Sequence, residues 1–600
     1  MWCAILSSSP SGALRRVSSS LWLITVMGTV PVSMLSVCGA QPIDHVWSRS
    51  FGDSQRDLCF SVTADPWGNL LLTGSFEGEL TFGSTTLVSA EGRDVFLAKL
   101  DPAGEPLWAR SFGAYQTQHA TAVAADAQGN VVLTGYFQNR IDLGGGEFVS
   151  AGGWDIFVAK FAPDGSHLWS RSFGDYADQW GTSADVDGGG NVYLAGYFRG
   201  ALDFGGGYLP TAGGWDVYLV RLEGETGAHA WSQRFGDPAD QIAAGVDVNE
   251  SGQIALSGTF AGTVDFGGGP MTAHTDDAFV AVYASGGECL WARGAGDYAT
   301  QTGLDVSIAP HGAVAFTGEF EGTIDLGGGP LTSAGLGDVF LAAYDAGGVF
   351  SWSQAFGDDA SQEPNAVAFD ASGDRITLAC TVAGDIDFGG GWLTGAGERD
   401  AGLALFGADG THLFSQLTGD AEPQYSGSVD WSVSGSLLYG GFFRGTIDLG
   451  GGPLTTAGDW DIFVASYRDP VQSVDLDEQD MPLPPDGAGG SDSVDGSDGM
   501  PSLAARLTAF PNPCRESTTL LLELPGGNLE PWDASAGSIR LGLFDASGRC
   551  SFGRWFDVTA GDEYVVSTTG LPAGVYFLRV AGGPAPPEAA LPQLRITRIP

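Results

Sequence analysis

The chain has 600 residues, more than one hydrophobic core accommodates, so we expect several domains or a repeat array. It carries 72 acidic and 26 basic residues, a net charge of −46, and its only lysines are Lys99 and Lys160. A chain this acidic repels phosphate backbones and anionic membranes, which argues against nucleic-acid binding and favours divalent cations as charged partners.

Residues 1–40 have the pattern of an export signal. Arg15 and Arg16 precede an apolar run at 21–37, and small residues at 38–40 predict cleavage after Ala40. A lipoprotein signal at Cys38 is the alternative. No later run of about 20 apolar residues appears, so we expect no membrane span.

Three phrases then recur seven times at a period of about 61 residues. The first is WSRSFGD, whose leading aromatic is Trp47, Trp108, Trp169, Trp231, Trp291, Trp352 or Phe414. The second is IDFGGG or a close variant of it. The third is an aspartate before a short apolar run: Asp94, Asp155, Asp216, Asp277, Asp338, Asp400 and Asp461. A fixed period of this kind predicts a repeat architecture.

One repeat contains four candidate strands, at 119–126, 131–137, 155–161 and 167–174, with a long loop at 138–154. The second and third candidate strands are apolar on both faces, as expected of a sheet covered on both sides. Four-stranded sheets repeated radially make a β-propeller, and a linear β-solenoid is the alternative, although its rungs are shorter.

The two ends of the array predict how it closes. The last repeat stops near Pro470 without a Trp-bearing strand, and the first begins with such a strand, around Trp47, with nothing before it. Pairing these ends closes a ring and removes both exposed sheet edges. We therefore predict an all-β fold with a seven-bladed propeller over 41–470.

The repeat phrases GN-V-L-G-F, ID-F/L-G and G-LWSRSFG resemble the bacterial β-propeller repeat family known as SBBP, over about 430 residues. This resemblance implies an exported or surface protein without assigned chemistry. Segments such as APDGSHLW at 162–169 are also similar to the tryptophan motif of quinoprotein dehydrogenase propellers, which have eight blades and a shorter repeat.

Residues 471–502 are acidic and rich in Gly, Ser and Pro, which predicts a disordered linker. The pattern of residues 503–600 predicts a second β domain. Pro511-Asn512-Pro513, Asp545 with Gly548-Arg549, and Gly574-Val575-Tyr576 resemble the C-terminal sorting domain of the type IX secretion system, and equally the related FlgD-like immunoglobulin-type fold. That resemblance implies a small β-sandwich and a partner in the secretion machinery. A plain accessory sandwich is the alternative.

Cys514 and Cys550 occupy two tail positions that usually carry core-facing apolar residues in the resembled family. The resemblance therefore implies a disulfide between them, which an oxidising compartment would preserve. Cys59, Cys289 and Cys380 fall at different points of different repeats, and we expect them to be buried free thiols.

No arrangement of catalytic residues stands out, and the IDFGGG glycines do not open a helix, so they predict a tight positive-φ arch instead of a nucleotide site. The long loops share one end of a propeller, called the top here. They carry the FGD aspartates Asp53, Asp175, Asp237, Asp297, Asp358 and Asp420. These carboxylates favour structural turns over Ca²⁺ sites, and we expect no other cofactor.

Residues that break the repeat are better candidates for ligand contacts. Just before the third strand, blades 2, 3 and 7 carry Trp154, Trp215 and Trp460, where blade 1 has Arg93, and a top loop adds Trp180. Around a closed ring these blades are neighbours, so we predict one aromatic arc suited to sugar rings. Tryptophans that merely pack on adjacent loops are the alternative.

Together these patterns predict an exported or surface-attached monomer that binds a glycan or protein through its top loops without catalysis. The alternative is a secreted hydrolase or lyase that uses carboxylates at the top. A ring of close carboxylates near the axis that are not repeat equivalents would favour this alternative, and repeat-equivalent carboxylates would not.

Overall fold

The computed structural model describes residues 43–468 apart from Glu91, together with seven strands between residues 506 and 598. Every regular element described is a β-strand. The predicted export signal (1–40) and linker (471–502) lie outside the described residues. Within the described part, no helix is long and apolar enough to span a membrane.

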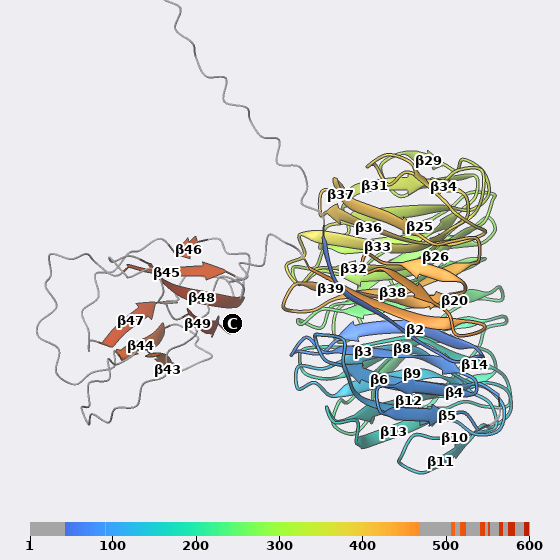
Figure 1. The fold of residues 1–600 in the computed structure, drawn as a ribbon. Coiled ribbons are helices and arrows are strands. Elements are labelled where there is room, and N and C mark those ends of the chain that lie inside the picture. Colours follow the sequence, from blue (N-terminus) through green and yellow to red (C-terminus); the bar gives the residue numbers. More distant parts are fainter. Residues whose placement is uncertain are drawn as a thin grey trace, which may run out of the picture. The chain divides into compact units, whose positions relative to one another are not determined.

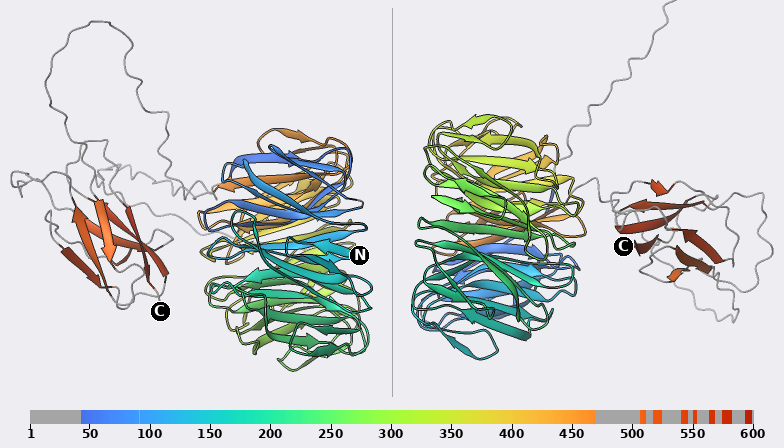
Figure 2. Two further views of the ribbon diagram at one scale, coloured as in Figure 1. Left: turned by 90° about the horizontal axis from the view of Figure 1, so that it is seen from below. Right: turned by 180° about the vertical axis from the view of Figure 1, so that it is seen from behind.

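Seven four-stranded antiparallel sheets form a ring, the blades of a β-propeller (Figures 1 and 2). The innermost strands of blades 1–7 are β2 (Asp57–Ala64), β8 (Gln118–Ala125), β14 (Gln179–Val186), β20 (Gln241–Val248), β26 (Gln301–Ile308), β32 (Gln362–Phe369) and β38 (Gln424–Trp431). The second strands are β3 (Leu70–Phe76), β9 (Val131–Phe137), β15 (Val192–Phe198), β21 (Ile254–Phe260), β27 (Val314–Phe320), β33 (Arg375–Val382) and β39 (Ser436–Phe443).

The third strands are β6 (Asp94–Leu100), β12 (Asp155–Phe161), β18 (Asp216–Leu222), β24 (Asp277–Tyr283), β30 (Asp338–Tyr344), β36 (Asp400–Gly407) and β42 (Asp461–Arg468). The outer strands of blades 1–6 are β7 (Pro106–Phe112), β13 (His167–Phe173), β19 (His229–Phe235), β25 (Cys289–Ala295), β31 (Phe350–Phe356) and β37 (His412–Thr418). The outer strand of blade 7 is β1 (Asp44–Phe51).

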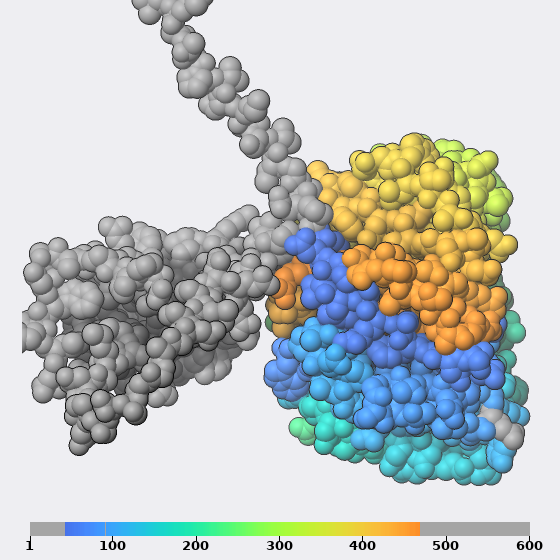
Figure 3. Space-filling model, viewed as in Figure 1, coloured from blue at the N-terminus to red at the C-terminus, as the bar shows by residue number. Residues whose placement is uncertain are grey.

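The ring closes through β1, which pairs antiparallel with β42 from Asp44↔Arg468 to Phe51↔Ile462. In the space-filling view the first residues of the propeller, in blue, lie directly against the last ones, in orange (Figure 3). Both the seven-blade count and the closure predicted from the unpaired end strands are confirmed.

Each long loop between the second and third strands contains a two-stranded ribbon that the sequence did not predict. The ribbons are β4 (Glu79–Phe82) with β5 (Thr85–Val88), β10 (Arg140–Asp142) with β11 (Glu147–Val149), β16 (Ala201–Asp203) with β17 (Tyr208–Pro210), β22 (Thr263–Asp265) with β23 (Pro270–Thr272), β28 (Thr323–Asp325) with β29 (Pro330–Thr332), β34 (Asp385–Ile386) with β35 (Leu393–Thr394), and β40 (Thr446–Asp448) with β41 (Pro453–Thr455).

The IDFGGG phrase makes the turn of these ribbons. In blade 2, Oδ1 of Asp142 accepts hydrogen bonds from the amides of Gly144 (2.8 Å) and Gly146 (3.2 Å). Both glycines have positive φ, 99° and 114°, which side chains disfavour. The predicted positive-φ arch is therefore confirmed, and its aspartate explains why a ribbon forms where a loop was expected.

The hydrophobic core lies between the blades. The described residues contain seven buried clusters, and each one joins two neighbouring blades. In blade 2, for example, β9 and β12 are buried along almost their whole length. Because their two faces pack on different neighbours, the second and third strands are apolar on both sides, as predicted.

The WSRSFGD phrase ties each blade to the next. The indole N–H of Trp108 in blade 1 donates to the carbonyl of Pro163 in the turn between the third and outer strands of blade 2, at 3.0 Å. The same bond joins Trp47 to Pro102, Trp169 to Gly224, Trp231 to Ser285 and Trp352 to Ala408. The residue two places later also donates to the next turn in blades 1 to 5, as Arg110, Arg171, Gln233, Arg293 and Gln354 do. These indoles therefore pack on the core and also link adjacent blades.

Ring closure explains why Phe414 stands where the other outer strands carry tryptophan. Blade 6 faces blade 7, whose third strand ends at Arg468 and whose outer strand begins at Asp44. No turn joins these two strands, so no described residue here offers the carbonyl that accepts the indole N–H of blades 1, 2, 3, 5 and 7. Gln416 donates instead to the hydroxyl of Tyr467, at 2.8 Å.

The two lysines link blades 1, 2 and 3 at the end of the ring opposite the long top loops. Nζ of Lys99 lies 2.8 Å from a carboxylate oxygen of Asp65 and donates to the carbonyl of Pro163 in blade 2. Lys160 repeats the arrangement with Asp126, also at 2.8 Å, and reaches the carbonyl of Gly224 in blade 3. Since all four charged side chains are almost fully buried, each charge depends on its partner.

The seven tail strands form two antiparallel sheets. One contains β43 (Arg506–Phe510), β44 (Ser517–Glu523) and β47 (Glu563–Ser567). The other has the order β46 (Cys550–Phe552), β45 (Arg540–Asp545), β48 (Gly574–Ala581), β49 (Gln593–Arg598). Strands thus occur in the segments where the sequence predicts them. Cys514 lies outside the described residues, so its disulfide with Cys550 stays a prediction.

The interblade indole bond predicts a difference between two like substitutions. Trp352→Phe should lower the free energy of unfolding by about 1 kcal/mol more than Trp291→Phe. Trp352 loses its bond to Ala408, whereas the indole nitrogen of Trp291 is buried without a hydrogen-bond partner. Chemical denaturation of the two variants measures this difference, and equal losses would contradict the role given to the indole N–H.

Candidate functional site

The FGD aspartates at the top of the ring close turns. In blade 3, Oδ1 of Asp175 accepts from the Ala177 amide and the Gln179 side chain, at 2.8 and 2.7 Å. Its Oδ2 accepts from the Ala201 amide, at 2.8 Å. Asp237, Asp297, Asp358 and Asp420 make the same set of contacts.

These contacts leave the FGD carboxylates little capacity for a metal. The hydrogen bond from the Ala299 amide, for example, lowers the pKa of Asp297. Across residues 43–468 and the tail strands, no group of three or more His, Cys, Asp or Glu side chains is placed to hold a metal ion. The structure thus gives these aspartates a turn-forming role in blades 3 to 7.

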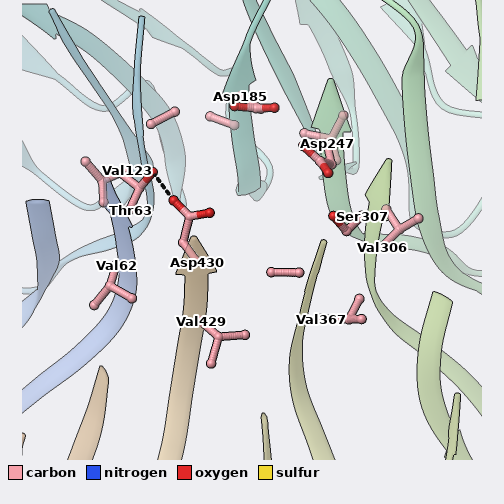
Figure 4. A pocket seen from close by; sticks show the side chains of 14 residues that line it. Val62, Thr63, Val123, Asp185, Asp247, Val306, Ser307, Val367, Val429 and Asp430 are labelled. Carbon is pink, nitrogen blue, oxygen red and sulfur yellow. Dashed lines mark hydrogen bonds between the residues drawn. The ribbon is translucent and has the colours of Figure 1, made fainter. Parts of the chain in front are cut away.

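A cavity of about 190 Å³ lies on the ring axis, and every innermost strand contributes two residues to its wall. Nine of the fourteen lining residues are valine or alanine, with Val62, Val123, Val306, Val367 and Val429 among them. Asp185, Asp247 and Asp430 project into the same space (Figure 4).

The axial carboxylates bridge neighbouring innermost strands. Asp185 accepts from the Val248 amide and Asp247 from the Ile308 amide, both at 2.7 Å. Asp305 accepts from the Val367 amide, and Asp430 accepts from the Thr63 hydroxyl, each at 2.8 Å. Because every bond crosses from one blade to the next, these groups hold the innermost strands together around the axis.

Burial raises the pKa of three of the axial carboxyl groups. Burial, assisted by the charge of Asp247, raises the pKa of Asp185. Burial likewise raises the pKa of Asp305 to about 7, and it raises the pKa of Asp430. At the start of the third strands, burial raises the pKa of Asp94, Asp155 and Asp461 to about 6.

These pKa values predict that mild acid stabilises the propeller. A carboxyl whose folded pKa exceeds its unfolded value of about 4 contributes most stability below that value and loses it as the pH rises through the folded pKa. The melting temperature should therefore rise as the pH is lowered from about 8 to about 5. Asp305→Asn keeps an acceptor for the Val367 amide and should flatten this profile, whereas the exposed-site control Glu321→Gln should not. A melting temperature that falls over this range would contradict the assignment.

Ten aromatic rings make a second candidate site, which we name the aromatic crescent. They lie near the start of the innermost strands, near the end of the second strands and just before the third strands. Its members, in order around the ring from blade 7 to blade 3, are Trp460, Tyr425, Phe442, Phe60, His119, Tyr136, Trp154, Trp180, Tyr197 and Trp215. All ten are half-buried, so each keeps part of its surface in solvent.

Ring contacts run without a break along the crescent. The centroid distances are 5.5 Å for Trp460–Phe442, 6.1 Å for Phe442–Phe60, 6.4 Å for Phe60–His119, 6.1 Å for His119–Trp154, 5.7 Å for Trp154–Trp180, 5.9 Å for Trp180–Tyr197 and 5.1 Å for Tyr197–Trp215. Burial, with the charge of Arg93, lowers the pKa of His119 to about 4, so its ring is neutral at physiological pH.

Arginines flank the crescent. The guanidinium of Arg199 lies 4.1 Å from the ring centroid of Trp215, and that of Arg444 lies 4.6 Å from Trp460. Arg399 is 5.5 Å from the ring of Tyr425. Each also pairs with a carboxylate, from Asp240, Asp459 and Glu363 respectively. The surface thus combines apolar rings with paired hydrogen-bonding groups.

The structure brings together the four tryptophans singled out in the sequence, Trp154, Trp180, Trp215 and Trp460. Arg93 lies beside them and pairs with Glu77, at 2.9 Å. Sequence reasoning missed the six other rings. The sequence does contain a signal for three of these six. Tyr136, Tyr197 and Phe442 share one repeat position, and an aromatic residue occurs there only in the blades that carry tryptophan before the third strand.

The carboxyl of Glu319 was also missed. Glu319 sits in β27, half-buried, at the repeat position of Tyr136 and Tyr197. Burial, followed by the charges of Glu363 and Glu321, raises its pKa to about 7. Glu363, in β32, pairs with Arg399 at 2.5 Å. The two glutamates therefore lie beyond the blade 7 end of the crescent and are not repeat equivalents.

The three cysteines of the propeller are free. Cys59 and Cys380 are fully buried, as predicted, and burial raises the pKa of Cys59 to about 12. Cys289 is only half-buried. None of these thiols belongs to the crescent.

No protein-family model matches the chain. The regulatory protein FlaEY of Caulobacter vibrioides is 31% identical over 171 residues, which cover 27% of this chain and 18% of that protein. The uncharacterized WD repeat-containing protein L264 of Acanthamoeba polyphaga mimivirus is 22% identical over 186 residues, 26% of this chain and 13% of that protein. The chain thus matches less than a fifth of the length of either relative.

Solved structures similar to this one are β-propellers at low identity. The propeller domain of Cps50 (Swd1) from Myceliophteria thermophila aligns with a TM-score of 0.36 and 9% identity, over 70% of this chain and 99% of that one. The Dos1 propeller aligns with a TM-score of 0.37 and 8% identity, over 71% of this chain and 95% of that one. These similarities concern the fold alone. The seven-bladed propeller fold itself rests on the sheet topology and ring closure described above.

Proposed function

We propose that this protein is an exported, non-catalytic propeller that binds carbohydrate through the aromatic crescent. The observation that carries the proposal is the unbroken run of half-buried rings across blades 7, 1, 2 and 3. The repeat positions of Trp154, Trp215 and Trp460 hold arginine, aspartate or glycine in the other four blades, so the ring does not require tryptophan there.

The chemistry of the crescent suits a sugar. The apolar faces of aromatic rings pack against the C–H face of a pyranose, and half-buried rings keep such faces accessible. The paired arginines and carboxylates beside Trp215, Tyr425 and Trp460 are held in place and supply donors and acceptors for hydroxyl groups. A protein ligand is the alternative occupant, and it would use the same rings as apolar anchors.

Two variants and one matched control test the proposal. Trp154→Ala and Trp180→Ala should each weaken glycan binding about tenfold or more, because each removes a stacking ring from the crescent. Trp392→Ala should leave binding unchanged, since Trp392 is 64% exposed in the blade 6 ribbon, outside the crescent. A glycan array identifies the ligand and calorimetry measures the affinities.

Melting temperatures of the variants separate loss of contact from loss of folding. A wild-type protein that binds no glycan on the array, or equal effects of all three variants, would contradict the proposal. Shortened glycans after incubation with wild-type protein would favour the hydrolase or lyase alternative.

We also propose that residues 503–600 are a sorting domain with a sandwich fold. The antiparallel sheets β43–β44–β47 and β46–β45–β48–β49 and the family-like motifs support this assignment. With the signal at 1–40, the tail accounts for export in two steps, through the inner membrane and then through the secretion machinery.

The sorting role predicts transport of a fused reporter. A reporter that carries an export signal and residues 503–600 should reach the medium or surface of a host with a type IX system. The same reporter with alanines in place of Pro511-Asn512-Pro513 should stay in the periplasm. Immunoblots of cell fractions measure this, and equal secretion of both reporters, or an intact tail on the surface protein, would favour a plain accessory domain.

A further inference from the structure

Glu319 is the one charged residue at its repeat position. The equivalent residues at the upper end of the second strands are Ser75, Tyr136, Tyr197, Thr259, Thr381 and Phe442. A half-buried carboxyl costs solvation free energy that a serine or threonine would not, so its presence calls for a compensating contact.

The fold provides a space for this carboxyl. Gly337 stands where blades 2, 3 and 7 carry tryptophan, and a Cβ on Gly337 would lie 1.6 Å from Oε1 of Glu319. The φ of Gly337 is not in the left-handed region, so the backbone does not require glycine. The glycine leaves room for the glutamate head group, which occupies the position of the missing side chain.

Nothing in the described part of the chain satisfies the Glu319 carboxyl. The neighbouring glutamate, Glu363, has Arg399 at 2.5 Å, and Arg399 in turn lies over the ring of Tyr425 at the end of the crescent. No hydrogen bond or ion pair from the described residues reaches the Glu319 carboxyl, and the charges of Glu363, Glu321 and Asp338 raise its pKa while that of Arg399 lowers it. Three of the four charged groups that act on this carboxyl are thus negative, and no donor among the described residues reaches it.

A ligand group that meets these conditions carries a positive charge and several N–H donors. A primary ammonium does so, because it makes charge-assisted hydrogen bonds to carboxylates and is attracted to aromatic faces. A sugar with a free amine presents this group on the ring that the crescent is suited to stack.

We propose that Glu319 binds the ammonium group of an amino sugar in a glycan held by the aromatic crescent. This inference rests on the proposed carbohydrate binding and specifies its substrate class. Arg399 holds Glu363 in β32, and Gly337 provides the space for the Glu319 carboxyl.

A matched pair of ligands tests the inference on the full chain, at near-neutral pH. Oligomers of β-1,4-linked glucosamine and their N-acetylated counterparts differ only in the charge and bulk of the amine substituent. The wild-type protein should bind the glucosamine oligomer about tenfold or more tightly than the acetylated one.

Glu319→Gln should remove this preference by weakening binding of the glucosamine oligomer alone. The Gly337→Ala change, which forces the carboxyl to move, should have the same selective effect. Glu288→Gln removes an exposed charge in the turn between β24 and β25 of blade 4, outside the crescent, and serves as the control that keeps the preference.

Three results would overturn the inference. The first is an unchanged preference in Glu319→Gln, and the second is equal affinity of the wild-type protein for the two oligomers, which leaves carbohydrate binding intact. The third is tighter, Glu319-dependent binding of an oligolysine peptide, which would assign the carboxyl to a protein partner. A wild-type protein that binds neither oligomer nor any other glycan would overturn the proposed function itself.

Discussion

A single blade of this propeller has two apolar faces and so cannot cover its own core. The second and third strands of each blade are buried on both sides, and each of the seven hydrophobic clusters is shared between two neighbours. Seven such blades cover all of their faces only as a closed ring, which is why the pairing of β1 with β42 matters more than any other contact. The remaining repeated residues, the indoles at the outer strands and the carboxylates at the axis, connect blades already brought together by this requirement.

Most of the fold could be predicted from the sequence because the residues that hold the ring together repeat. The period, the strands apolar on both faces and the unpaired strand around Trp47 were sufficient to predict seven blades and their closure. The ribbons were not predicted, because the turn at Asp142 depends on two backbone amides that only the folded loop presents to its carboxylate. The change from tryptophan to Phe414 was likewise unexplained until the structure showed that blade 7 lacks a turn opposite it.

The candidate site could be predicted only in part. Departures from the repeat identified Trp154, Trp180, Trp215 and Trp460, and blade order placed them on one side of the ring. Tyr136 and Tyr197 were not predicted, because an aromatic residue in a buried strand is usually part of the hydrophobic core. Only the structure shows that Tyr136 contacts Trp154 and Trp180 and that Tyr197 contacts Trp215. The FGD aspartates had two sequence interpretations, turn or metal, and the hydrogen bonds of each carboxylate favour the turn.

The repeated residues therefore hold the ring together, and the residues that occur in one blade only are the candidates for ligand contacts. A residue present in every blade is constrained by its neighbours in the ring, as Asp461 is by the glycine that packs against its carboxyl. A residue found in one blade only is not constrained in this way. Where it is a partly buried carboxyl, the free energy lost on removing it from water needs another explanation. Glu319 and Gly337 change together in blade 5, one gaining a charged head group and the other losing the side chain that would collide with it. Because the six other blades form with other residues at both positions, we infer that the pair serves a ligand at the top of the ring.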